Sequence, residues 1–575
     1  MTPSVPLRRT LRLEGDLDDA RAARTQVLLT GAGVNDILVD RDGRALRLQA
    51  ALQSYCAHRE LGLVVYRFGA GAAALPTLPD GTAVPLRMPT AGDGPAQAVA
   101  HILDELRGSP NPSVFAFDFA DSVIPIAPTL SLEVAVLMEH LRALTQDVTR
   151  WQQRGMQLLI IDRGGGISPR LASHPGIRTV HLGAPDQRES TLFINKSTST
   201  ETRERLHLDP GLSVTEAGRL TRGLLNLTVH ERRLISSPES PLTAAQITDV
   251  KSAAIRQLSH DTLELMPDRL AFGADVAGLP NVRLHLRDMQ LIGQKTVRVL
   301  LSGPPGTGKT LSATAIGSLL QVPVVRFGSV LNQFLGVSES NMDRALHVLR
   351  ELAPLVLFID EADQRGLGSR GHSTETHETY QNLRAMLFEF LGDTGADNGI
   401  SVVATTNVPA RLDEAVRSRF TVLPVLLPSG PELAQIMTIH ARRSGIPMHV
   451  DPIDQMCRHV ADGHVLSGRS APKVLTRAWV RAHWAHHDEV TAEDIADALG
   501  DHVGDDWTPG AEYSTLTSVL AVDGADAWPW VAAQQLGEEY DIPGALVPYI
   551  RSDRKVDMTM VSDRIVELEK AHVYR

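Results

Sequence analysis

The sequence predicts two α/β modules in tandem, each a mostly parallel sheet flanked by helices and each followed by a helical segment. Apolar runs of strand type alternate with stretches of helical spacing through the first module, and this alternation is typical of a parallel sheet. The same alternation restarts near Thr296. A chain of 575 residues is also too long to fold around one ordinary core. We therefore expect two or three domains.

The first module contains predicted strands separated by predicted helices. Runs rich in Val, Ile, Leu and Phe predict buried strands over residues 26–32, 61–69, 113–120, 156–163 and 177–183. Apolar residues three and four positions apart predict helices over residues 45–60, 95–108 and 132–155. Residues 213–259 are predicted to be wholly helical, which indicates a small bundle behind the sheet.

The second module repeats this organisation. Its predicted strands are residues 296–303, 322–328, 355–360, 400–407 and 421–428. A predicted helical segment, residues 431–499, comes next, and then a tail rich in Gly, Asp and Trp. Trp528 and Trp530 in that tail fit either a partner-docking patch or a small packed core.

The composition is that of a folded soluble protein, with 43% hydrophobic residues. We find no apolar run long enough to span a bilayer and no signal-peptide segment at the N-terminus, so we expect a cytoplasmic protein without a membrane span. A net charge of −12 makes nucleic acid an unlikely partner, because binding to phosphates usually needs a basic surplus. The basic residues are mostly arginine, a bias typical of GC-rich bacterial genomes.

Residues 303–310, G-P-P-G-T-G-K-T, match the pattern G-x-x-x-x-G-K-[ST] between a predicted strand and a predicted helix. The backbone N–H groups of such a loop wrap around phosphates, and the start of the following helix adds the positive end of its dipole. We expect Lys309 to reach the β- and γ-phosphates and the Thr310 hydroxyl to bind Mg²⁺. The loop therefore predicts an ATP site with Mg²⁺ as the second cofactor.

Asp360 and Glu361 stand at the end of the predicted strand 355–360, where open α/β sheets bind ligands. Asp360 is expected to hold the same Mg²⁺ as Thr310, and Glu361 to polarise the attacking water as a general base. Two adjacent acids at a buried strand end are costly unless a cation offsets them. Residues 360–363 also spell D-E-A-D, which names a helicase family, but we find no second RecA-like domain downstream and no arginine-rich nucleotide motif.

Asn407 ends the predicted strand 400–407, where its amide can orient the water between Glu361 and the γ-phosphate. The segment L-D-E-A-V-R-S-R-F follows and supplies two arginines, Arg417 and Arg419.

These four motifs, in this order, resemble those of AAA+ ATPases of the remodelling type, over roughly residues 270–499. The resemblance implies a P-loop NTPase sheet sandwiched by helices, a helical lid, and ATP hydrolysis. It also implies a nucleotide site shared between neighbouring subunits of a ring, usually a hexamer. In that family the residue matching Arg419 is an arginine finger for the next subunit's γ-phosphate, and we rank Arg417 second.

Three further segments resemble the same family. Residues 275–279 resemble the lining of its adenine pocket, which implies nucleotide contacts from Val276 and Gly278. Phe334 matches the pore-loop aromatic that grips a polypeptide client, with a core aromatic as the alternative. Arg469 matches the arginine at the start of the lid's sensor helix, with a surface arginine as the alternative. The residues expected to cradle the nucleotide are Gly303, Pro304, Pro305, Gly306, Thr307, Gly308, Lys309, Thr310 and Leu311.

The first module has the same order of elements without the chemistry. No G-K-[ST] follows its early strands, and Phe119 takes the place of a catalytic glutamate beside Asp118, which we interpret as a remnant or a structural acid. This arrangement resembles tandem bacterial and plastid AAA+ proteins whose N-terminal ATPase-like half is degenerate, and it implies a regulatory or substrate-docking role. The predicted division is a degenerate ATPase-like domain (1–210), a helical lid-like segment and linker (211–262), a P-loop subdomain (263–430), a helical lid (431–505) and a C-terminal extension (506–575).

The leading hypothesis is an ATP-hydrolysing ring that remodels a protein client or assembles a complex. A slow, nucleotide-controlled scaffold is the first alternative, because half of the tandem lacks catalytic residues. A DNA-directed AAA+ loader is the second, and the acidic net charge counts against it.

Overall fold

The computed structural model places two compact units, Met1–Val250 and Lys251–Arg575, here called unit 1 and unit 2. The described residues are 9–40, 43–90, 92–127, 129–164, 166–200, 205–226, 229, 231–232, 235–259, 262–266, 269–328, 339–363, 378–393, 399–462, 464–502 and 506–571.

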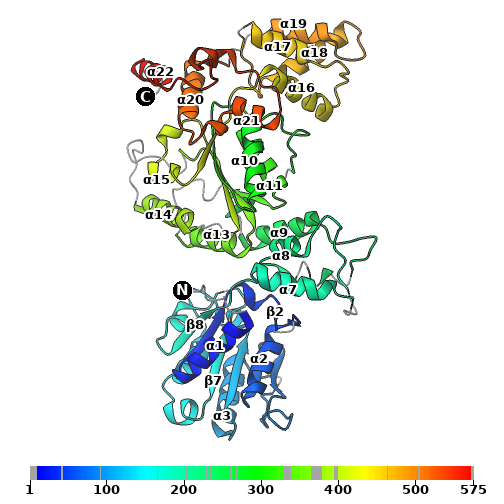
Figure 1. The fold of residues 1–575 in the computed structure, drawn as a ribbon. Coiled ribbons are helices and arrows are strands. Elements are labelled where there is room, and N and C mark those ends of the chain that lie inside the picture. Colours follow the sequence, from blue (N-terminus) through cyan, green and yellow to red (C-terminus); the bar gives the residue numbers. More distant parts are fainter. Residues whose placement is uncertain are drawn as a thin grey trace. The chain divides into compact units, whose positions relative to one another are not determined.

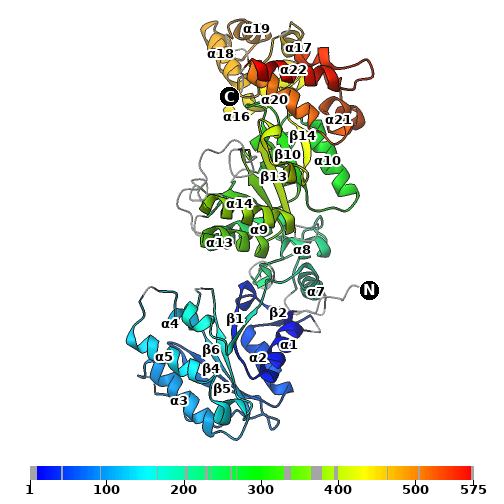
Figure 2. The same cartoon turned by 90° about the vertical axis from the view of Figure 1, so that its left-hand side faces the viewer.

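Unit 1 is built on a six-stranded sheet in the order β5-β4-β6-β7-β1-β8 (Figures 1 and 2). All neighbours are parallel except β4 and β5, which form an antiparallel edge. The strands are β1 (Gln26–Thr30), β4 (Gly62–Arg67), β5 (Gly71–Leu75), β6 (Ser113–Asp118), β7 (Gln157–Ile161) and β8 (Ile177–His181), beside a small hairpin of β2 (Leu38–Val39) and β3 (Ala45–Leu46).

Helices cover both faces of this sheet, as Figure 2 shows, with α1 and α2 on one side and α3, α4 and α5 on the other. Two separate hydrophobic cores result, one under each layer of helices. The helices are α1 (Arg9–Ala22), α2 (Leu48–His58), α3 (Pro95–Gly108), α4 (Ala120–Val123), α5 (Leu132–Ala143), α6 (Pro169–Ala172), α7 (Gln187–Thr198) and α8 (Val214–Leu220).

Three expectations for unit 1 need correction. The predicted helix 132–155 ends at Ala143 and is followed by a π-helical turn, Val148–Gln152. The sequence predicts no strand between residues 69 and 113, but Gly71–Leu75 form strand β5. Residues 213–259 are not wholly helical: α8 and α9 (Ala244–Ser259) are separated by a turn at Ser237–Ser240, where Pro238 and Pro241 disfavour a helix.

Unit 2 contains a second six-stranded sheet in the order β14-β10-β13-β12-β11-β9. Its parallel strands are β10 (Arg298–Ser302), β11 (Val324–Phe327), β12 (Leu355–Ile359), β13 (Ile400–Thr406) and β14 (Thr421–Pro424), and β9 (Leu263–Leu265) adds an antiparallel edge. Figure 2 shows α13 (Glu339–Glu351) and α14 (Glu378–Asp393) on one side of this sheet and α10 (Pro280–Leu291) on the other. The helix that follows β10 is α11 (Lys309–Leu319).

The remaining helices of unit 2 form two groups beyond the sheet (Figure 1). The first is a bundle of α16 (Gly430–Ser444), α17 (Ile453–Ala461), α18 (Ala471–Trp484) and α19 (Ala492–Gly500), with its own apolar core. The second is the C-terminal group of α20 (Pro509–Leu520), α21 (Pro529–Leu536) and α22 (Met558–Lys570). Trp528 and Trp530 are buried in the second group with ring centroids 5.8 Å apart, so they belong to a packed core.

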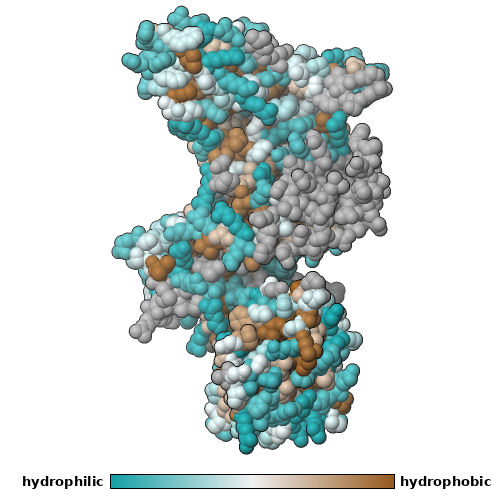
Figure 3. All heavy atoms as spheres, turned by 180° about the vertical axis from the view of Figure 1, so that it is seen from behind, coloured by the Kyte–Doolittle hydropathy of each residue, from teal (hydrophilic) through white to brown (hydrophobic). Residues whose placement is uncertain are grey.

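The predicted fold class, an α/β P-loop NTPase sheet with a helical lid, is confirmed. In the described part of the chain, no helix is both long enough and apolar enough to cross a membrane. On the face of the molecule in Figure 3, hydrophobic residues form small patches among hydrophilic ones.

Candidate functional site

A cavity of 540 Å³ lies within unit 2, and the predicted phosphate loop forms one of its walls. This volume lies inside the range of small-molecule sites, roughly 300 to 1,000 Å³. The polar lining comes from the loop after β10, the residues after β12 and the end of β13, since the carboxyl ends of parallel strands meet at one edge. Of the predicted site residues, these line it: Val276, Pro305, Gly306, Thr307, Gly308, Lys309, Thr310, Leu311, Asp360, Glu361, Asn407 and Arg469.

The loop after β10 needs glycine where the backbone bends sharply. Gly303 has a φ of 152°, and a Cβ there would lie 2.0 Å from the carbonyl oxygen of Val425. Gly308 has a φ of 90° and immediately precedes α11, so the N-terminus of that helix begins at the cavity. The loop thus presents backbone N–H groups and a helix dipole to one space, which is the arrangement that phosphates favour.

Lys309 projects from the first turn of α11 back over its own loop. Its Nζ donates to the carbonyl oxygens of Gly303 (2.6 Å) and Pro304 (2.7 Å) and to Oδ1 of Asn407 (3.0 Å). Burial lowers the pKa of Lys309 to about 8, although Asp360 and Asp363 oppose that shift. The ammonium is therefore held among oxygen acceptors at the centre of the site.

Asp360 and Glu361 follow the buried strand β12. Oδ1 of Asp360 accepts a hydrogen bond of 2.6 Å from the Thr405 hydroxyl. The same hydroxyl oxygen accepts a hydrogen bond of 2.9 Å from the backbone N–H of Glu361. Glu361 has a φ of 48°, so the chain turns sharply directly after Asp360. Thr405 was not singled out by sequence reasoning, yet it holds the carboxylate of Asp360 and the backbone of Glu361.

Asn407 is fixed from the side opposite Lys309. Its backbone carbonyl accepts a 2.5 Å hydrogen bond from the hydroxyl of Ser514 in α20. Asp506, just before α20, accepts a 2.6 Å hydrogen bond from the N–H of Ser467, two residues before Arg469. The C-terminal extension thus contacts two segments of the cavity wall, and nothing in its sequence pattern signals this.

The helical bundle closes another side of the cavity. Arg469 lies just before α18, and its Cβ would lie 3.3 Å from a Cβ placed on Gly306. Apolar and polar residues of the bundle that sequence reasoning missed also line the cavity: Ile436, Ile439, His440, Arg443 and Pro472. Together with Val276 and Leu279 they form a wall of apolar and polar side chains that suits a planar base.

Gly278 is not among the cavity-lining residues. A Cβ at this position, where φ is 66°, would lie 2.0 Å from Oε1 of Glu432. That buried carboxylate accepts hydrogen bonds from the N–H groups of Leu279 (3.2 Å) and Ser429 (2.9 Å), and burial raises its pKa. Gly278 therefore allows the close packing of the adenine-pocket segment on the start of α16.

Arg417 and Arg419 lie away from this cavity, at the end of α15 (Glu414–Arg417) and just after it. Arg419 is exposed and donates to the carbonyl oxygen of Ala415. Phe334, the expected client-gripping aromatic, lies outside the described residues.

The donors at the cavity fit a magnesium ion. Thr310 and Asp360 offer hydroxyl and carboxylate oxygens, which are the hard donors that Mg²⁺ prefers. The hydrogen bond from Thr405 occupies Oδ1 of Asp360, and no other described residue donates to its second oxygen.

Comparisons with known proteins agree with this geometry. Residues 299–424 match the model of the ATPase family associated with various cellular activities (AAA). The chain is 30% identical over 261 residues to the ATP-dependent zinc metalloprotease FtsH 3 of Synechocystis sp., covering 42% of this chain and 41% of that protein. It is 34% identical over 204 residues to FtsH of Acidothermus cellulolyticus, covering 34% of this chain and 30% of that protein.

The chain thus spans less than half the length of these curated relatives. A solved AAA domain of FIGL-1 aligns at 25% identity and a TM-score of 0.35, over 43% of this chain and 88% of that one. The sequence of this chain contains no H-E-x-x-H, the pattern of helical zinc proteases. Unit 2 contains an AAA ATPase domain.

The first prediction concerns Ser514. Ser514→Ala removes the hydrogen bond that fixes the Asn407 carbonyl, a loss on the order of 1 kcal/mol. We expect the kcat of ATP hydrolysis to fall roughly three- to tenfold with little change in KM, because the phosphate loop is untouched. Ser562→Ala on exposed α22 is the matched control and should leave both constants unchanged. A rise in KM with an unaltered kcat would contradict a positioning role.

The second prediction concerns the pH dependence of nucleotide binding. Because burial lowers the pKa of Lys309 to about 8, its ammonium is charged in the free protein below that pH. Above it, binding must take up a proton, so affinity for Mg·ATP should fall by up to about tenfold per pH unit. Calorimetry between about pH 7 and pH 9.5 measures this. Lys309→Arg, which stays charged, should remove the dependence, and a flat wild-type profile would refute the assignment.

Proposed function

Because unit 2 contains an AAA ATPase domain, we propose that this chain binds Mg·ATP in the 540 Å³ cavity and hydrolyses it. The observation that carries the proposal is the convergence of Lys309, Asp360, Glu361 and Asn407 on one space. Phosphoryl transfer to water uses this set of groups, namely a cation, two acids and an amide at the carboxyl edge of a parallel sheet.

Each group has a role that its position supports. The loop from Gly303 to Thr310 binds the phosphates, with Lys309 on the β- and γ-phosphates. Thr310 and Asp360 hold Mg²⁺, which supplies positive charge beside the phosphate oxygens. Glu361 accepts a proton from the attacking water, and Asn407 orients that water. Arg469 adds positive charge from the bundle side.

We propose further that the chain acts as a ring, with a hexamer as the first expectation. Arg419 is exposed and outside its own cavity, as an arginine serving a neighbouring copy would be, and Arg417 is the second choice. ATP turnover in this ring would remodel or assemble a protein client, with Phe334 as the proposed contact. A cytoplasmic location and a bacterial source remain part of this proposal.

One alternative keeps support from the structure. A slow, nucleotide-controlled scaffold fits a chain in which the sequence of unit 1 carries no phosphate-loop lysine. A DNA-directed loader has less support, because the net charge is −12. Capture of a client by a Glu361→Gln variant with ATP, compared with the same variant carrying Lys309→Ala, separates remodelling from slow nucleotide binding.

The third prediction tests the chemistry of the cavity. Lys309→Ala should abolish ATP binding, since the loop loses its cation. Glu361→Gln should keep binding and lose roughly 10²- to 10⁴-fold in hydrolysis, because only the proton acceptor is removed. Glu489→Gln in an exposed loop of the bundle is the matched control. Equal ATPase rates for Glu361→Gln and wild type would rule out the base assignment.

The fourth prediction tests the shared site. Arg419→Ala should still bind ATP and lose most hydrolysis, roughly 10³-fold or more, because the finger acts on charge that develops during transfer. Mixing Glu361→Gln with Arg419→Ala should restore part of the activity, since some interfaces then pair an intact Glu361 with an intact Arg419. Mixed assemblies that form by mass measurement but recover nothing would refute the intersubunit finger and favour the scaffold.

A further inference from the structure

The parallel strands of the two sheets have the same order, and their registers place unit 1 residues on the site residues of unit 2. Reading each sheet from the edge formed by its last strand in the chain, the parallel strands β8-β1-β7-β6-β4 correspond to β14-β10-β13-β12-β11. The antiparallel edge strands differ, because β5 follows β4 in the chain and β9 precedes β10. Leu29 pairs with Ile161 as Leu301 pairs with Thr405. Two residues further along, Arg163 therefore stands where unit 2 has Asn407.

The same comparison places Asp118 on Asp360. Phe117 pairs with Ile160, and Ile359 pairs with Ala404 at the matching position. Asp118 comes directly after Phe117, as Asp360 comes directly after Ile359. Phe119 then matches Glu361, and both have left-handed backbones, with φ of 58° and 48°. Unit 1 thus keeps the backbone register at these two strand ends and changes the side chains there.

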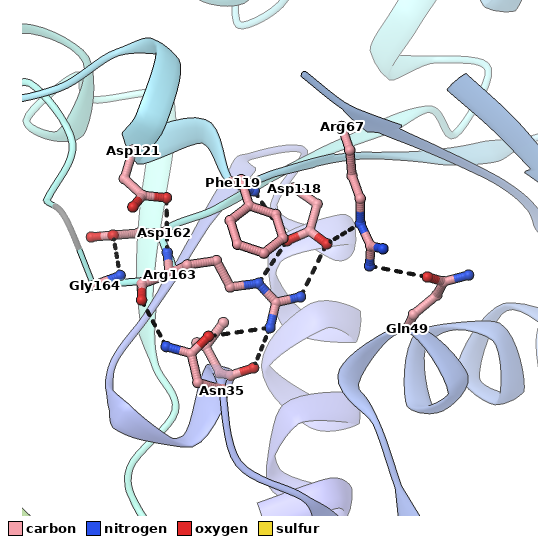
Figure 4. A network of polar contacts seen from close by, with 10 residues as sticks. Asn35, Gln49, Arg67, Asp118, Phe119, Asp121, Asp162, Arg163 and Gly164 are labelled. Carbon is pink, nitrogen blue, oxygen red and sulfur yellow. Dashed lines mark hydrogen bonds and ion pairs between the residues drawn. The ribbon is translucent and has the colours of Figure 1, made fainter. Parts of the chain in front are cut away.

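Every lone-pair direction of Asp118 is taken up within the protein (Figure 4). Oδ1 accepts from Nε of Arg163 (2.7 Å) and from the N–H of Phe119 (3.1 Å). Oδ2 accepts from Nε of Arg67 (2.8 Å) and from a terminal nitrogen of Arg163 (3.0 Å). A carboxylate has about four acceptor sites, so this one, with 2% of its side chain exposed, has none left for a metal ion.

Arg163 also binds the loop that replaces the phosphate loop. Its Nη1 donates to the carbonyl oxygen of Val34 (2.6 Å), and Asn35 donates to the carbonyl oxygen of Arg163 (2.7 Å), as Figure 4 shows. In unit 2 the cation belongs to the loop, where Lys309 reaches Asn407. In unit 1 the cation has moved to the facing strand end and reaches the loop from there.

That loop packs closely against the chain that follows β8. A Cβ on Gly31 would lie 2.6 Å from the carbonyl oxygen of Leu182, and one on Gly33 would lie 2.2 Å from that of Gly183. The loop continues as a single 3₁₀ turn, Ala32–Val34, and the next α-helix begins only at Leu48. In the described residues between β1 and Leu48 no α-helix begins, in contrast to α11 after Gly308.

We propose that unit 1 is an ATPase-like module whose ligand site is permanently closed by its own side chains. The guanidinium of Arg163, joined by that of Arg67, takes the place of metal and phosphate between Asp118 and the loop at residues 31–35. Unit 1 therefore binds no Mg·nucleotide and keeps one conformation while unit 2 passes through its nucleotide states. This goes beyond the ATPase proposed for unit 2 and does not depend on it.

The fifth prediction uses hydrogen exchange of the full chain, read by mass spectrometry in segments. In the wild type, Mg·ATP should protect residues 303–310 and leave exchange at residues 31–37 unchanged. Asp118→Asn should speed exchange at residues 31–37 and 113–123 by tenfold or more, because it strands a buried cation. Asp104→Asn breaks an ion pair on α3 whose carboxylate is 76% exposed and should change neither segment.

Other variants keep the test decisive if Asp118→Asn does not fold. Arg67→Gln retains the Arg163 pair and should give a smaller change in the same segments. The Asp118→Asn and Arg163→Gln double variant should be no worse than the more damaging single one, because the two residues act together. Protection of residues 31–37 by Mg·ATP, or unchanged exchange there in all three variants, would overturn the closed site. Lost protection at residues 303–310 alone would count against the proposed function instead.

Discussion

The register of three parallel strands determines where the polar groups at the sheet edge of the unit 2 cavity lie. Ser302 of β10 pairs with Thr406 of β13, and Ile359 of β12 pairs with Ala404. β10 and β13 therefore end level with each other, β12 ends two residues earlier, and the residues that follow the three strands share one edge. A slip of one residue would send Asp360 into the interior and turn Thr405 away from it. The phosphate loop, the acids and Asn407 are a consequence of that alignment.

Placing charges at such an edge requires compensation, because an isolated carboxylate at a buried strand end is strongly disfavoured. Among the described residues of unit 2, one oxygen of Asp360 has no protein donor and Lys309 lies among carbonyl oxygens, so the cavity can accept a cation and a phosphate. Unit 1 satisfies Asp118 internally. Burial works to raise the pKa of Asp118, but the hydrogen bonds and charges of Arg163 and Arg67 outweigh it, and the pKa lies below its usual value. The same sheet-edge geometry thus forms an open site at Asp360 in unit 2 and a closed site at Asp118 in unit 1.

Local signals made most of this predictable. The strands of both sheets follow from apolar runs, and the cavity follows from a loop pattern whose residues are adjacent in the chain. Long-range contacts were not predictable in the same way. Ser514 is 107 residues from Asn407, and Arg163 is 45 residues from Asp118. The sequence places these partners on separate elements, and only the packing brings them together. Likewise β5 lacks bulky residues, and its pairing with β4 along an edge outweighs weak strand propensity.

The left-handed turn after each aspartate shows what the fold retains when the chemistry changes. A non-glycine residue in this conformation costs about 1–2 kcal/mol, so interactions with its surroundings must offset that free energy. At Glu361 the turn brings a carboxylate to the cavity wall. At Phe119 it sets a ring 5.1 Å from the guanidinium of Arg163 and 5.9 Å from that of Arg67, where the ring face attracts both cations and covers their pair with Asp118. The strain arises from the strand-to-turn geometry, not from the side chain. In unit 1 the same turn carries an aromatic ring that covers the pair of Asp118 with Arg163 and Arg67, so the site is closed without a change in the strand register.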